Sequence, residues 1–136
     1  MPVIKYYNAI QPAKPFTFYV LAKGLNSGRP MEKPCPNCFT VTCKNAEEMD
    51  FYFTLTFGLW KSKSFHYYLT GSVIPFLRID DFKSLVLNHG NKLQDSKNGF
   101  LKSVLQVKMI EQKERLIREQ LKLLNDLKIT MIRRHL

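Results

Sequence analysis

The sequence has no long hydrophobic run. None of its segments approaches the roughly 18 consecutive apolar residues that a membrane-spanning helix requires, and the N-terminal stretch MPVIKYYNAIQPAKPF contains no apolar core of signal-peptide length. We therefore expect a cytoplasmic protein that does not use a membrane as a partner. With 45% hydrophobic residues, the chain still contains enough apolar material to fill the core of one ordinary domain.

Cysteine is also scarce, and its three residues do not suggest a secreted disulfide framework, because the count is odd. The string CPNC at residues 35–38 has the spacing with which two thiolates reach one tetrahedral zinc ion. A second pair is missing, so a complete site would need Cys43 and a histidine at position 66 or 89. We expect structural thiols and no cofactor, and we keep zinc bound by Cys35, Cys38 and Cys43 as an alternative.

Motifs that carry catalysis are absent as well. The sequence contains no G-x-S-x-G, no H-E-x-x-H and no Walker loop, and its three histidines lie in unrelated contexts. Asp80 and Asp81 form an acidic pair, but such a pair in front of an apolar helix more commonly caps the helix. We therefore expect a binding protein with no catalytic residues, and not an enzyme.

Acidic residues are few in relation to basic ones. Lys and Arg number 21 against 11 Asp and Glu, so the formal net charge is +10. Charge of that sign attracts phosphate backbones, which makes nucleic acid the first partner to consider. The alternative is a basic surface that is merely solvated. Residues 1–99 and 100–136 each carry +5, so the excess is spread over folded surfaces and not over a charged tail.

Aromatic and β-branched runs predict strands over residues 16–22 and 38–43, separated by a loop rich in glycine and proline. Asn45 with Glu48 predicts the start of a helix that extends to about residue 60. Its core face is expected to include Met49, Tyr52, Phe53, Thr56, Phe57 and Trp60. A short helix capped by Asp80 or Asp81 should end near Leu87. Together these elements predict an α+β fold with a small mixed sheet and packed helices.

Residues 88–99 contain two glycines and three asparagines, and we interpret them as a linker that closes a compact domain over residues 1–99. Residues 100–136 contain neither proline nor glycine and predict one long amphipathic helix. Ile110, Ile117, Leu124 and Met131 recur every seven residues, and Leu121 broadens the seam. Such a coiled-coil pattern favours a homodimer or a partner helix, and the alternative is a helix folded back on its own domain.

Basic side chains lie in loops or at element ends between aromatic segments. Loops on a rigid scaffold commonly carry binding, and Lys or Arg at such places contacts phosphates. We therefore predict a nucleic-acid surface from this set, although ordinary solvated charge remains the alternative for each member. The set comprises Lys23, Arg29, Lys61, Lys63 and Arg78.

The order of several strings resembles a known family. Residues 37–41 (NCFTV), 71–75 (GSVIP) and 80–85 (DDFKSL), followed by Glu111-Gln112 and the helix to Leu136, are similar to the second half of a target recognition domain. Such domains belong to the specificity subunits of type I restriction-modification systems. The front portion is shortened here, as in a half-sized, truncated module. The sequence also looks like small uncharacterised proteins of Bacteroidota.

This resemblance implies DNA as the partner, the GSVIP turn with Ser72 as part of the contact, and pairing through the long helix. Our leading hypothesis is therefore a non-catalytic DNA-binding module that dimerises or docks through residues 100–136. A protein-interaction adaptor or structural protein without DNA binding is the main alternative, and a zinc-stabilised binding module is a further one.

Overall fold

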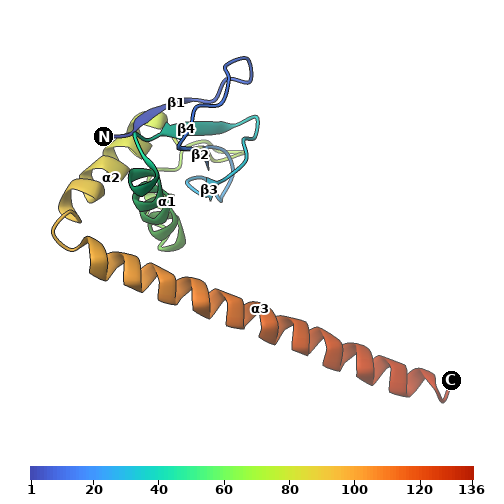
Figure 1. Cartoon of the computed structure of the whole chain (residues 1–136). Helices are drawn as coiled ribbons and strands as arrows, with labels where there is room; N and C mark the ends of the chain where they lie inside the picture. The colour runs from blue at the N-terminus through green and yellow to red at the C-terminus, as the bar shows by residue number, and fades with distance from the viewer. The chain divides into compact units, whose positions relative to one another are not determined.

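A computed structural model describes all residues from 1 to 136. The chain divides into two compact units, Met1–Lys97 and Asn98–Leu136. The first unit contains a sheet with two helices, and the second consists of most of one long helix (Figure 1). The α+β class predicted from the sequence is confirmed.

The sheet has four strands in the order β1-β4-β2-β3. The strands are β1 (Val3–Tyr6), β2 (Thr17–Leu21), β3 (Pro30–Met31) and β4 (Cys38–Thr42). Every pair of neighbouring strands is antiparallel. The sequence-based prediction of a mixed sheet is therefore wrong. Among the neighbouring pairs, only β2 and β3 follow each other directly in the chain, whereas β4 lies between β1 and β2. Parallel neighbours usually need a helical crossover, and no helix lies between these strands because all four precede α1.

The two predicted strands correspond to β2 and β4, but β1 was not foreseen. Val3–Tyr6 is only four residues long and has proline on one side, which gives a weak local signal. It forms a strand because it pairs with β4, with Ile4 opposite Val41. Pairing over such a distance in sequence cannot be read from a local pattern.

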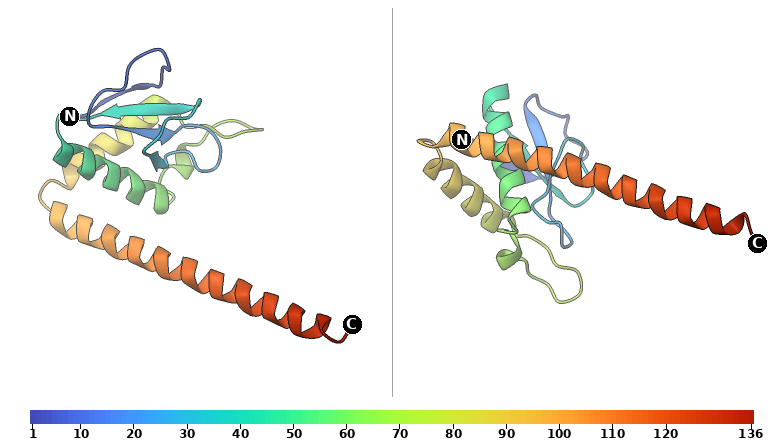
Figure 2. Two further views of the ribbon diagram at one scale, coloured as in Figure 1. Left: turned by 45° about the vertical axis from the view of Figure 1, so that its right-hand side comes forward. Right: turned by 90° about the horizontal axis from the view of Figure 1, so that it is seen from below.

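Three helical segments complete the first unit. They are α1 (Ala46–Lys61), the 3₁₀ turn η1 (His66–Tyr68) and α2 (Ile79–Lys92). Helices α1 and α2 cover the same face of the sheet, α1 beside β2 and β3 and α2 beside β1 (Figures 1 and 2). The core between these layers consists mainly of Phe18, Val20, Phe39, Val41, Leu55, Phe82 and Val86.

Helix α1 begins as the sequence predicts. The Asn45 side-chain oxygen accepts a hydrogen bond from the Glu48 amide at 2.8 Å, and the Glu48 carboxylate accepts one from the Lys44 amide at 2.8 Å. The cap therefore satisfies two amides that the helix itself leaves without partners. Burial acts to raise the pKa of Glu48, but these hydrogen bonds and nearby positive charge prevail and lower it.

The core face of α1 differs from the expected one. Of the predicted stripe, Tyr52 and Thr56 are buried, whereas Met49, Phe53, Phe57 and Trp60 are only half-buried. The side chains of Phe51, Leu55 and Leu59 are buried in their place. Apolar residues occupy most of the circumference of this helix, so periodicity alone defines two overlapping stripes. Packing against the sheet and α2 selects between them.

The expected linker over residues 88–99 is wrong, because α2 continues to Lys92 and only residues 93–96 separate it from the next helix. Gly90 is a packing position: a Cβ there would lie 3.1 Å from the Tyr52 ring, so glycine lets α2 approach α1 closely.

The prediction that Asp80 or Asp81 caps helix α2 is also wrong. The N-cap is Arg78, which makes no side-chain capping bond, and both carboxylates lie in the first turn.

Helix α3 (Lys97–Arg133) supplies most of the second unit and, at 1.5 Å per residue, is about 55 Å long. The predicted seam residues are exposed, between 55% and 61%, at Ile110, Ile117, Leu121, Leu124 and Met131. A second row with the same spacing of seven lies one residue away, at Met109, Leu116 and Leu123, and it is also exposed. The apolar face of α3 is therefore wider than a two-row coiled-coil seam.

Candidate nucleic-acid interface

Three loop segments of the first unit are joined into one structure, which we call the basic end: residues 22–29, 60–66 and 70–78. The Gly24 amide donates to the Pro75 carbonyl at 2.7 Å, and the Leu77 amide donates to the Ala22 carbonyl at 2.8 Å. The His66 ring nitrogen Nε2 bonds the Leu25 carbonyl at 3.1 Å. Loops that are far apart in sequence are therefore held at one place on the scaffold.

The turn over residues 22–29 has a defined backbone. Gly24 and Gly28 have φ values of 94° and 96°, which non-glycine residues rarely adopt. The buried Ser27 hydroxyl donates to the Gly24 carbonyl at 2.6 Å and closes the turn. At Gly28 a Cβ would lie 2.1 Å from the ring of Phe65, which is itself buried. Only glycine fits there, so the turn rests directly on Phe65.

The predicted nucleic-acid residues all lie in the basic end and are all exposed: Lys23, Arg29, Lys61, Lys63, Ser72 and Arg78. Two of them meet at one aromatic ring. The Arg29 guanidinium carbon is 5.6 Å and the Lys61 ammonium nitrogen 5.8 Å from the ring centroid of Trp60. Each such cation–π contact contributes about 0.5–1 kcal/mol at an exposed site. Trp60 therefore holds two positive charges close together.

The charge of the basic end is of one sign. None of its three segments contains Asp or Glu, and the nearest acidic residues in sequence are Glu32 and Asp80. Arg78 forms an ion pair, since its Nε lies 3.3 Å from the Asp81 carboxylate. Its charge is partly neutralised by this ion pair, which makes Arg78 a weaker candidate for a phosphate contact.

The tip of the basic end is a tight loop over residues 70–76. Thr70 and Phe76 exchange backbone hydrogen bonds of 3.0 and 2.8 Å, and Gly71 turns the chain with φ 103°. Val73, at the tip beside Ser72, is 90% exposed. Tyr67 in η1 is also 90% exposed. Apolar and aromatic side chains of this kind can contact bases or sugars, alongside cations that contact phosphates.

Sequence reasoning missed Trp60 of the basic end and the neighbouring Tyr67. Trp60 was expected in the core, yet its ring is the platform for Arg29 and Lys61. Tyr67 has no role in the sequence-based prediction. A signal was present in the string WKSK at residues 60–63, because an aromatic residue next to alternating lysines is more typical of a surface than of a core.

All three cysteines are free thiols, and Cys38 and Cys43 are buried. Burial raises the pKa of Cys38 and of Cys43 to about 11, and the Cys38 thiol donates to the Cys35 carbonyl at 3.0 Å. Residues 1–136 contain no cluster of three or more His, Cys, Asp or Glu side chains suited to a metal ion. The two histidines considered as extra zinc ligands each bond a backbone carbonyl, His66 that of Leu25 and His89 that of Leu85.

We expect only one of the three thiols to react quickly with Ellman's reagent at pH 8. A pKa of about 11 leaves on the order of one thiol in a thousand ionised for Cys38 and Cys43, whereas Cys35 is half-exposed. In denaturant all three should react at similar rates.

Addition of a chelator should leave the melting temperature of the protein unchanged. A fall of several degrees, together with zinc in elemental analysis, would support the zinc-stabilised alternative.

None of the helices combines the length and apolar character needed to cross a bilayer.

Among curated proteins and among solved structures, no significant match to this chain was found. One family model matches, over residues 4–134, and these residues include the sheet, the basic end and nearly all of α3. The chain therefore belongs to DUF6943, a family of unknown function.

Proposed function

We propose that this protein binds double-stranded DNA without catalysis, through the basic end, as a module similar to a restriction-modification target recognition domain. The observation that carries this proposal is the one-sided charge of three hydrogen-bonded loops. In this arrangement Lys23, Arg29, Lys61 and Lys63 contact phosphates. The proposal has the exposed Ser72 at the tip contact a groove of the duplex.

The contacts within the basic end support this proposal. Ordering a long cationic side chain on binding costs about 0.5–1.5 kcal/mol, and the Trp60 contacts restrict Arg29 and Lys61 in advance. The turn beneath Arg29 is fixed by two positive-φ glycines and by Phe65. Charges held in place in this way can follow the regular spacing of phosphates better than charges on a mobile loop.

The wide apolar face of α3 supports association as the second part of the proposal. We propose that α3 pairs with a second copy or with a partner helix, so that a small DNA-binding module acts as a dimer or as part of a larger complex. Exposed rows at a spacing of seven are typical of helices that bury this face against another helix. A dimer would carry two basic ends, and contact of both with one duplex would raise the affinity through avidity.

The salt dependence of duplex binding tests the proposal. If about five phosphates are contacted by one copy, the logarithm of the affinity should fall with the logarithm of salt with a slope near −4.5, or roughly 500-fold between 50 and 200 mM. Fluorescence anisotropy with a labelled random duplex of about 20 base pairs measures it. Absence of binding at 50 mM salt would remove DNA as the partner of this surface.

A second candidate function is favoured by α3 alone. A protein-interaction adaptor would use the apolar face of α3 and would have no need of the basic end. The two proposals differ in one measurement, because an adaptor associates through α3 but gives no salt-dependent anisotropy change with duplex DNA.

A further inference from the structure

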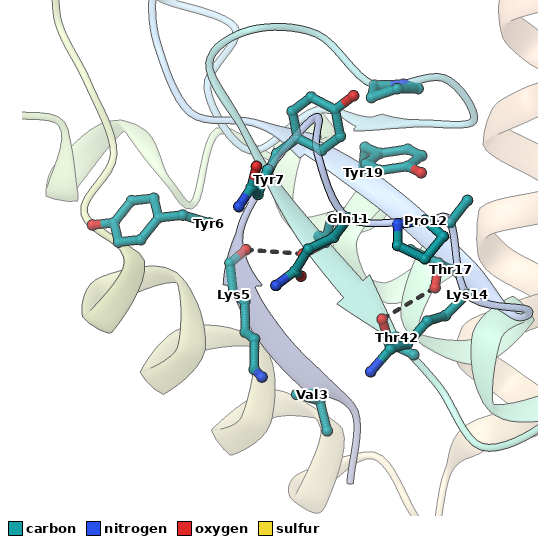
Figure 3. A pocket seen from close by; sticks show the side chains of 14 residues that line it. Val3, Lys5, Tyr6, Tyr7, Gln11, Pro12, Lys14, Thr17, Tyr19 and Thr42 are labelled. Carbon is teal, nitrogen blue, oxygen red and sulfur yellow. Dashed lines mark hydrogen bonds between the residues drawn. The ribbon is translucent and has the colours of Figure 1, made fainter.

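The face of the sheet opposite the helices carries a cavity. Strand residues Ile4, Phe18, Val20, Phe39 and Val41 are buried toward the helices, and because strand side chains alternate, their neighbours point the other way. These neighbours form the floor, and the loop after β1 overhangs it (Figure 3). The cavity has a volume of about 370 Å³, and no residue of the basic end lines it. Its size is within the range of small-molecule sites.

The floor of this cavity is polar. Thr17 Oγ1 and Thr42 Oγ1 lie 3.1 Å apart in a hydrogen bond that uses one of their two hydroxyl hydrogens. The other hydroxyl hydrogen can be donated to a ligand, and both oxygens still have lone pairs. The Thr40 hydroxyl donates to the Lys5 carbonyl at 3.2 Å, so its oxygen also remains an acceptor. Three threonine hydroxyls thus line a hollow in a sheet.

The charge around the cavity is positive. Lys5 and Lys14 are among the lining residues, and no Asp or Glu is. In Figure 3 the Lys14 side chain extends toward Thr17 and Thr42, and Lys5 projects from β1 at the side of the same floor. Two ammonium groups without a carboxylate between them favour an anionic group, and ammonium is a common partner of phosphate.

The remaining wall is aromatic and apolar. Tyr7 and Tyr19 meet edge to face with ring centroids 5.7 Å apart, and Pro12 and Pro34 line the cavity beside them. Flat apolar surfaces of this kind suit a planar ring. Gln11 on the overhanging loop adds an amide that can both donate and accept. The cavity therefore offers cations, hydroxyls and a wall for a ring within one small volume.

We propose that this cavity binds a nucleoside monophosphate, as a site separate from the duplex-binding surface. Lys5 and Lys14 contact the phosphate, the hydroxyls of Thr17 and Thr42 contact the sugar or phosphate oxygens, and the base lies against the wall of Tyr7 and Pro12. The ligand is a mononucleotide because the volume accommodates one such unit and because the cationic, hydroxyl-rich and apolar parts match its three chemical parts.

Isothermal titration of the full chain with AMP and UMP tests this site, with ribose 5-phosphate and the unphosphorylated nucleosides as probes of each part. We expect the nucleotides to bind and the fragments to bind at least tenfold more weakly. The double substitution Lys5→Ala, Lys14→Ala should lower nucleotide affinity by about 10- to 100-fold, as loss of charge-assisted hydrogen bonds does. Thr42→Val, which keeps the shape and the strand preference, should lower it severalfold.

The matched control is Lys33→Ala, Lys44→Ala, which changes the net charge equally and should leave nucleotide binding unchanged. Thermal melting of all variants establishes that they are folded. No heat with either nucleotide, equal loss in the control, or ribose 5-phosphate binding as tightly as AMP would overturn the proposal. Duplex anisotropy with the Lys5→Ala, Lys14→Ala variant should remain within about twofold of the parent protein, so failure of this site and failure of duplex binding are distinguishable.

Discussion

If the protein pairs through α3 as proposed, the double substitution Ile117→Glu, Leu124→Glu should leave only a monomer of 15.9 kDa. Both side chains belong to the row of seven-residue spacing on α3 and are more than half exposed within the chain. In a dimer they would be buried, so the variant would place four carboxylates in an apolar interface at a cost of several kcal/mol. We expect the dissociation constant to rise by at least about 1,000-fold. Multi-angle light scattering at tens of micromolar protein measures it.

Arg115→Glu, Lys122→Glu is the control for this experiment. It introduces the same two glutamates on the same helix, at positions that 100° steps place on the other side from the seam. This control should stay associated, and both variants should keep the melting transition of the first unit. A parent protein that is already monomeric at 100 µM, or a seam variant that remains associated, would contradict pairing through these two rows.

Reversing two charges of the basic end should have the second largest effect. Arg29→Glu, Lys61→Glu removes both cations beside Trp60 and places two carboxylates where phosphates would lie. Each lost charge-assisted contact is worth about 1.5–3 kcal/mol, so we expect duplex affinity at 50 mM salt to fall by at least about 100-fold. The salt slope should also become shallower by about two. Anisotropy titrations at three salt concentrations measure both quantities.

A control variant separates the effect of the net charge on DNA affinity from the effect of where the substituted charges lie. Lys33→Glu, Lys44→Glu also lowers the formal charge from +10 to +6, at exposed residues outside the basic end. If DNA binds at the basic end, this control should lose less than about tenfold. An equal loss in both variants would show that binding follows the overall charge, and the assignment of the site to these loops would be abandoned.

The elements that sequence reasoning predicted correctly have local causes. Asn45 and Glu48 are three residues apart, and their capping bonds form within a single turn. The seven-residue spacing on α3 is likewise a property of one helix. The basic side chains were predicted from their places in loops, and the structure indeed brings those loops together, but the hydrogen bonds between residues 22–25 and 66–77 that join them were not predictable.

The elements that were missed depend on distant partners. Gly90 was interpreted as a linker residue, although its role is set by the Tyr52 ring on another helix. Strand β1 exists because β4 pairs with it. The cavity on the outer face combines a loop near the N-terminus with three strands, and the threonines of its floor were simply strand residues in the sequence. Tertiary packing determines each of these features, and no window of neighbouring residues contains it.

The contact between Gly28 and Phe65 has a consequence for how this surface can evolve. Gly28 cannot accept a side chain, both because φ is positive and because Phe65 occupies the space. Phe65 in turn packs against Phe82, with ring centroids 5.6 Å apart, and Phe82 packs against Phe39 of the sheet. The charged residues above this aromatic column are exposed and can be exchanged one by one at little cost in stability. Substitutions at these charged positions can therefore change the charge of the basic end while the aromatic packing beneath Gly28 is retained.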